Sequence, residues 1–131
     1  MAIPTTTALY GSLNALLNIV LAVRVSNARR AAHVSLGTGD SQALLVAVRT
    51  HANSAEFVPL AILMLLIVEL CGGSSLWLHV LGGSLLLARV VHIPGMAMKK
   101  APNAPRFMGN AITWVGIAVS AAYALWLRSR G

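Results

Sequence analysis

Three polar residues recur at helical spacing inside an apolar stretch of the chain. Arg49, Asn53 and Glu56 stand at positions i, i+4 and i+7, so a helix would place the three side chains on one face. Arg89 and His92 stand at i and i+3 in another apolar stretch. Guanidinium groups bind carboxylates, whereas a glutamate binds an ammonium group. Together these side chains suit a zwitterionic ligand that has more than one carboxylate.

The same residues also have a purely structural interpretation. Arg49, Asn53, Glu56 and Arg89 would then neutralise one another and lock the helices together, since buried polar pairs can specify packing while adding little stability. Glu56 and Arg89 are expected at similar depth. There they would form an ion pair or share a polar network.

The surroundings of these residues follow from the composition. The chain has 131 residues, of which 57% are hydrophobic and only 10% are charged, and its mean hydropathy is +0.76. An ordinary soluble domain has roughly 25% charged residues, and so short a chain leaves much of its surface exposed. We therefore expect lipid to cover much of this surface. A charged side chain at mid-helix then costs about 2.5 to 3.5 kcal/mol and needs a partner.

Four apolar stretches have about the length of a membrane-crossing helix, and they cover residues 5–25, 47–70, 76–91 and 109–127. Residues 72–75 form a tight uncharged hairpin between the second and third stretches, and Pro94, Pro102 and Pro105 are expected to break the helix before the fourth. No Lys or Arg precedes the first stretch, so we expect it to remain as a helix rather than to be cleaved as a signal peptide. The predicted fold is all-α, a single integral-membrane four-helix domain over residues 1–131.

The net charge of +7 indicates topology rather than nucleic-acid binding, because no basic stripe with interleaved aromatic residues is present. The basic residues gather in two loops, which contain Arg24, Arg29 and Arg30 after the first stretch and Lys99, Lys100 and Arg106 after the third. The positive-inside rule predicts that both loops face the cytoplasm and both termini face outward.

Other polar residues within the spans give weaker signals. Asn14 and Asn18 share a helical face with Gly11, an arrangement that more often joins helices than binds a ligand. Glu69 is expected at the outer interface, in contact with water. The four histidines and one cysteine show no metal-ligand spacing, so no metal site is expected. A stripe of mostly small residues in the fourth stretch predicts a helix contact surface, formed by Gly109, Thr113, Gly116, Ser120 and Tyr123.

Residues 49–59, RTHANSAEFVP, resemble the span-two signature of the MAPEG family, the membrane-associated proteins of eicosanoid and glutathione metabolism, and in particular its small bacterial members. Three further segments look like the bacterial branch in order and spacing: VSLG at residues 34–37, RVVH at 89–92 and RFMG at 106–109. The resemblance extends over nearly the whole chain.

The resemblance implies a homotrimer of four-helix subunits in the bacterial inner membrane, with glutathione bound between neighbouring subunits on the cytoplasmic side. Glu56 would lie near the α-amino group of glutathione. Arg106 would lie beside the sulfur and favour the reactive thiolate, because a nearby cation lowers the pKa of a thiol. The residues implied to hold glutathione are Arg49, Asn53, Glu56, Arg89 and His92.

The implied activity is that of a glutathione transferase, with possible peroxidase chemistry, that uses glutathione as co-substrate on lipophilic electrophiles. Ala52 and Met96 stand where some eicosanoid-pathway members have an arginine and a tyrosine. These departures favour, as an alternative, a non-catalytic protein that binds lipid or presents a partner. A small multidrug exporter also has four spans, but we would expect a carboxylate in its first span, where this chain has Asn14 and Asn18.

Overall fold

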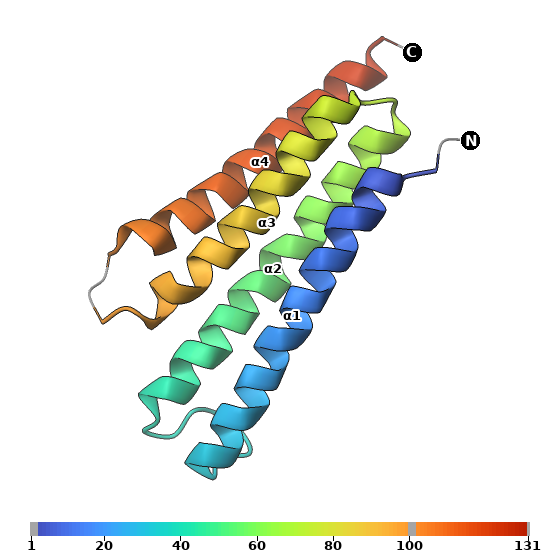
Figure 1. Cartoon of the computed structure of the whole chain (residues 1–131). Helices are drawn as coiled ribbons and strands as arrows, with labels where there is room; N and C mark the ends of the chain where they lie inside the picture. The colour runs from blue at the N-terminus through green and yellow to red at the C-terminus, as the bar shows by residue number, and fades with distance from the viewer. Residues whose placement is uncertain (1–2, 100–101, 131) are drawn as a thin grey trace.

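Four antiparallel helices make up the computed structural model, which describes residues 3–99 and 102–130. The helices are α1 (Thr5–Ala32), α2 (Gln42–Leu70), α3 (Ser75–Ala97) and α4 (Ala104–Arg128). They run alternately up and down, so both termini lie at the same end of the bundle (Figure 1). We name this the terminal end. The opposite end, where α1 and α3 finish and α2 and α4 begin, is named the loop end.

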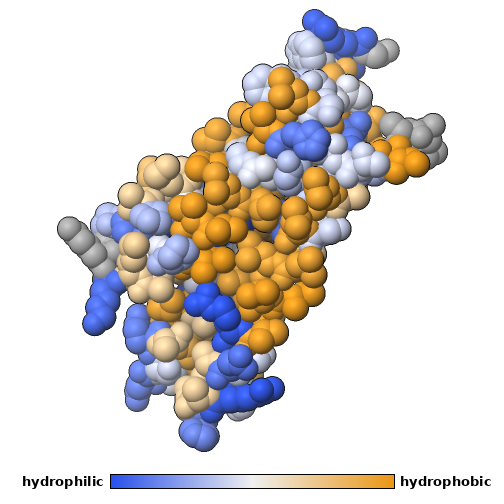
Figure 2. Space-filling model, viewed as in Figure 1, coloured by the Kyte–Doolittle hydropathy of each residue, from blue (hydrophilic) through white to orange (hydrophobic). Residues whose placement is uncertain are grey.

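Each of the four helices is long and apolar enough to cross a bilayer. Large apolar side chains face outward along them, and Leu16, Val115 and Leu125 are each more than half exposed. The visible face has a broad apolar region at mid-height, with hydrophilic residues gathered towards both ends (Figure 2). The prediction of an all-α integral membrane protein with four spanning helices is confirmed.

All four helices extend further at the loop end than the expected spans: α1 runs on to Ala32, α2 begins at Gln42, α3 runs to Ala97, and α4 begins at Ala104. The expectation that Pro94 ends the third helix is wrong, because α3 continues past it. A helix tolerates the loss of one backbone N–H when neighbouring helices support it. Pro105, which was also expected to break the helix, lies in the first turn of α4. A backbone N–H in the first turn has no acceptor within the helix, so its absence in proline costs no hydrogen bond there.

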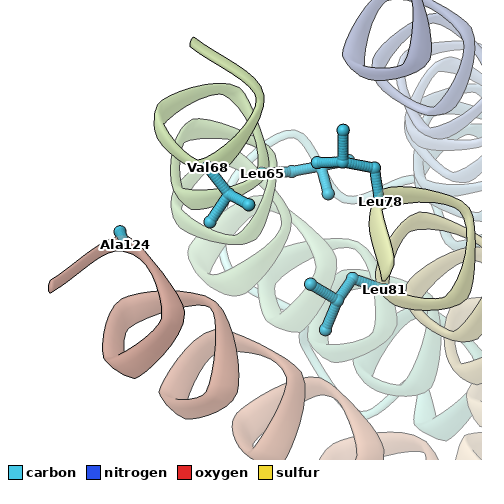
Figure 3. Close-up of a cluster of buried hydrophobic side chains, with 5 residues drawn as sticks. All are labelled: Leu65, Val68, Leu78, Leu81 and Ala124. Atoms are coloured by element: carbon cyan, nitrogen blue, oxygen red, sulfur yellow. The ribbon is translucent and has the colours of Figure 1, made fainter. Parts of the chain in front are cut away.

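A small hydrophobic core lies between α2, α3 and α4 near the terminal end (Figure 3). The tight turn that brings α2 back as α3 includes Gly72, whose φ of 81° favours glycine. Because this turn is short, the last residues of α2 pack directly on the first turns of α3. The core residues are Leu65, Val68, Leu78, Leu81 and Ala124.

The first helix is attached to this core through its N-terminus. Glu69 accepts the backbone N–H of Thr6 at 2.9 Å and that of Thr7 at 2.7 Å, each through a separate carboxylate oxygen. These N–H groups belong to the first turn of α1, where no helical carbonyl can accept them and where the helix dipole favours an anion. Glu69 therefore caps another helix from its place in the last turn of α2, a role that the sequence did not predict.

Candidate functional site

The start of α4 is held against the end of α3 by Asn103. Its Oδ1 accepts the backbone N–H of Arg106 at 3.0 Å, which caps the helix. Its Nδ2 donates to the carbonyl oxygen of Gly95 at 2.9 Å. At Gly95 an added Cβ would lie 2.5 Å from the backbone nitrogen of Arg106, so only glycine permits this close approach. The two contacts together fix the position of Arg106 relative to α3.

A groove of about 720 Å³ opens at the loop end. Met96 and several aliphatic side chains form its apolar wall. Among the described residues that line it, none is acidic, so the groove is electropositive and attracts anions. We name it the basic groove after its four cationic residues, which are Arg24 of α1, Arg49 of α2, Lys99 after α3 and Arg106 of α4.

A second hollow of about 440 Å³ lies along α4, and Arg106 lines this one as well. Its walls include Phe107, which is 70% exposed, and Trp114, which is 53% exposed. Both aromatic rings are therefore available to lipid. We name this hollow the apolar groove. Arg106 thus stands between a site for charged groups and a site for apolar ones.

Arg89 lies in the interior, where it is 2% exposed. Its Nη1 donates to Asn53 Oδ1 at 2.8 Å, and its Nη2 donates to the carbonyl oxygen of Gly109 at 2.6 Å. The ion pair expected between Glu56 and Arg89 is not formed, because Arg89 points to these neutral acceptors. Glu56 is exposed and makes no hydrogen bond or ion pair with the described part of the chain. Arg89 and Asn53 do share a polar network, but Glu56 is not part of it, so neither arrangement expected for Glu56 and Arg89 is formed.

His92 is buried where α3 and α4 approach closely. An added Cβ at Gly109 would lie 2.6 Å from His92 Cβ, so the absent side chain of Gly109 makes room for the histidine. Gly109, Thr113 and Ser120 are all buried, which confirms the small residues of α4 as a contact surface. His92 Nε2 and Arg89 Nε are buried without a hydrogen-bond partner among residues 3–99 and 102–130.

The whole bundle matches one known family. The sequence profile of the MAPEG family matches residues 7–126 of the chain, from the first turns of α1 to the last turn of α4. The chain belongs to the MAPEG family. It is also 31% identical to the Inner membrane protein YecN of Escherichia coli K12. The 119 aligned residues cover 91% of this chain and 89% of that protein. The same values hold for the protein of that name in Escherichia coli O6:H1.

In this MAPEG protein the implied glutathione-binding residues fall into separate groups. Arg49 and Arg106 meet in the basic groove. Asn53 and Arg89 are hydrogen-bonded to each other and do not line the groove, and His92 is buried between α3 and α4. Glu56 lines no part of the basic groove in its own chain.

The structure adds Arg24 and Lys99 to the basic groove, whereas the sequence assigned them only a role in topology. The antiparallel packing of α1 on α2 brings Arg24 beside Arg49. Arg24 lies within one helical turn of the end of the first predicted span. This position is the sequence signal that would have indicated Arg24 as a residue of the groove. Lys100, which was assigned the same role as Lys99, lies outside the described residues.

No metal centre is formed by the described residues, in which no three His, Cys, Asp or Glu side chains gather closely enough to hold an ion. Arg29, another cation of the loop end, donates to the carbonyl oxygens of Ser35 and Gly37 at 3.3 and 2.8 Å. It orders the loop after α1 instead of facing the basic groove. The chemistry that the basic groove offers is therefore electrostatic: it can hold an anion and stabilise a negative charge beside Arg106.

Proposed function

We propose that this protein binds glutathione in the basic groove and transfers it to lipophilic electrophiles. The observation that supports this function is the position of Arg106, which lines both the basic groove and the apolar groove. Glutathione is an anion with two carboxylates and one ammonium group, which suits a groove lined by cations. An electrophile dissolved in the bilayer reaches the same arginine through the apolar groove.

The guanidinium of Arg106 acts on the glutathione thiol. A cation in contact with a thiol lowers its pKa and increases the fraction of thiolate, which is the nucleophile. The thiolate sulfur attacks the electrophilic carbon, and a carbon–sulfur bond forms as the leaving group departs with its electron pair. The same thiolate can attack a lipid hydroperoxide: the oxygen–oxygen bond breaks, the lipid leaves as an alcohol after protonation, and glutathione is oxidised to a sulfenic acid. A second glutathione reduces the sulfenic acid to glutathione disulfide and water, which completes a peroxidase reaction.

We also propose a homotrimer in which glutathione lies between neighbouring subunits. Glu56 is exposed on α2 and lines no part of the basic groove of its own chain. In an assembly, the Glu56 of one subunit is free to receive the ammonium group of glutathione held in a neighbouring groove. Light scattering of the purified protein in detergent gives the number of subunits, and a monomer would contradict the proposal.

We place the protein in the bacterial inner membrane, where its relative YecN is named, with the loop end in the cytoplasm. The single cysteine, Cys71, tests this orientation because it is exposed in the turn at the terminal end. A membrane-impermeant maleimide should label Cys71 in intact spheroplasts. Labelling only in inverted vesicles would indicate the opposite orientation, with the loop end outside the cytoplasm.

Glutathione titration by calorimetry, followed by conjugation of chlorodinitrobenzene, tests the activity. We expect binding at millimolar glutathione or below. Arg106→Gln should slow conjugation about tenfold or more, since one unit of thiol pKa is a factor of ten in ionisation, while glutathione affinity falls less. Arg128→Gln is the matched control, because Arg128 is an exposed arginine of α4 at the terminal end.

A second function is favoured by Met96, which lines the basic groove but offers no hydroxyl to a thiolate. In this second function the groove holds glutathione or lipid without turning it over. Glutathione binding without conjugation would support a non-catalytic role. No binding at millimolar glutathione, together with co-purified lipid, would support a lipid-binding or partner-presenting role.

A further inference from the structure

A third hollow, of about 260 Å³, lies between α1 and α2. It is close to the middle of both helices, and the residues that line it are different from those of the basic and apolar grooves. All the residues that line it are uncharged. We name it the asparagine groove because Asn14 and Asn18 of α1 face Ser54 of α2 across it.

The two asparagines leave hydrogen-bond acceptors unused in this groove. Asn14 is 2% exposed, and its Nδ2 donates to the carbonyl oxygen of Tyr10 in its own helix at 2.9 Å. The Oδ1 atoms of Asn14 and Asn18 are buried without a partner among residues 3–99 and 102–130. The asparagines therefore do not join α1 to α2 by hydrogen bonds. A buried carbonyl oxygen without a donor is costly, and more so in a membrane.

The α2 side of the groove also presents unused polar groups. The hydroxyls of Thr50, Thr113 and Ser120 each donate to a carbonyl in the preceding turn of their own helix. Ser54 is equally buried, at 4% exposed, but its hydroxyl makes no hydrogen bond within the described part of the chain. Pro59 has no N–H, so the carbonyl of Ala55 loses the donor that a regular helix supplies four residues later.

We propose that the asparagine groove binds an uncharged amphiphile that donates hydrogen bonds, of the phenol or alcohol class. The buried Oδ1 atoms of Asn14 and Asn18 both lack a donor among the described residues, so a ligand with a hydroxyl group is favoured over an ether or ketone. The absence of charge among the residues that line it disfavours ions. Val58 and Ile62 supply an apolar wall for a ring or a short chain. Such a ligand reaches this depth by dissolving in the bilayer.

The test compares para-trifluoromethoxyphenol with its methyl ether, which has nearly the same shape but no donor. Fluorine NMR of the full-length protein in nanodiscs measures the binding of each probe. We expect saturable binding of the phenol, about fivefold tighter than that of the ether, as one net hydrogen bond provides. Equal affinities of the two probes, or no saturable binding of the phenol, would overturn the proposal.

Two variants locate the site. Ser54→Ala and Asn14→Leu should each weaken phenol binding about fivefold and leave ether binding unchanged. Asn14→Leu should also raise the melting temperature of the unliganded protein, because it removes an unpaired buried oxygen. Ser12→Ala is the control, since Ser12 is exposed on α1 and lies outside the groove.

A second copy of the chain is the competing occupant. Asn14→Cys would then form a disulfide or a short cross-link between subunits, and the phenol would not bind to the native protein. That pair of results would assign the groove to the subunit interface and overturn the ligand site. Phenol affinity unchanged in both Ser54→Ala and Asn14→Leu would likewise place the ligand elsewhere.

Discussion

Arg89 of α3 and Asn53 of α2 are joined by a hydrogen bond of 2.8 Å between Nη1 and Oδ1. The same guanidinium donates to the carbonyl oxygen of Gly109 in α4 at 2.6 Å. One side chain therefore ties three helices together. Because residues of these three helices also line the basic groove, the network helps to fix the positions of its walls.

Removing the amide of Asn53 should destabilise the bundle. Asn53→Ala leaves one nitrogen of a buried cation without its acceptor, and an unsatisfied buried polar group costs about 1–3 kcal/mol. Unfolding in detergent, followed by circular dichroism, measures the loss. Asn27→Ala should have no comparable effect, because Asn27 is exposed on α1. Equal stability of the two variants would show that the network does not hold the helices together.

The close approach of α3 and α4 predicts opposite effects for two glycines of α4. In Gly109→Ala the new methyl group would lie 2.6 Å from His92 Cβ and 2.8 Å from the carbonyl oxygen of Ala88. The helices must separate, at a cost of about 1–3 kcal/mol for overpacking. Gly116 has open space around its Cβ position. Gly116→Ala should therefore stabilise the helix by about 0.5–1 kcal/mol, as thermal unfolding of both variants in one detergent will show.

The cap that Glu69 provides for α1 predicts local fraying when its charge is removed. Glu69→Gln keeps one acceptor oxygen but loses the second acceptor and the negative charge beside the helix N-terminus. Hydrogen exchange at the amides of Thr6 and Thr7 should accelerate about tenfold or more. Amides in the middle of α1 should keep their protection. Unchanged exchange at Thr6 and Thr7 would mean that other groups satisfy this helix end.

The basic groove predicts that Arg24 contributes to glutathione binding. Arg24→Gln removes one of its four cations and should weaken glutathione affinity about threefold to tenfold, as expected for a partly hydrated charge pair. Added salt should weaken native binding in the same direction. Arg30→Gln is the matched control, because Arg30 lies at the same end of α1 but does not line the groove. Equal glutathione affinities of the two variants would show that Arg24 does not contribute to glutathione binding.

Much of the fold could be predicted because lipid imposes a simple rule on the sequence. A backbone in hydrocarbon must satisfy its hydrogen bonds within helices, so each long apolar stretch corresponds to one spanning helix. The helix ends were less predictable. A proline interrupts helices in soluble proteins, yet α3 continues past Pro94 to Ala97 because α4 packs alongside it. Pro105, expected to lie before α4, is part of its first turn.

The sequence by itself determined the four spans, the family and the polar residues that have to find partners. It did not determine which partner each would take, since helical spacing gives the face of a residue but not the neighbour opposite that face. Only the tertiary structure paired Arg89 with Asn53 instead of Glu56, and only antiparallel packing placed Arg24 in the basic groove. The physical reason is that hydrogen bonds act over about 3 Å, a distance that helix packing sets.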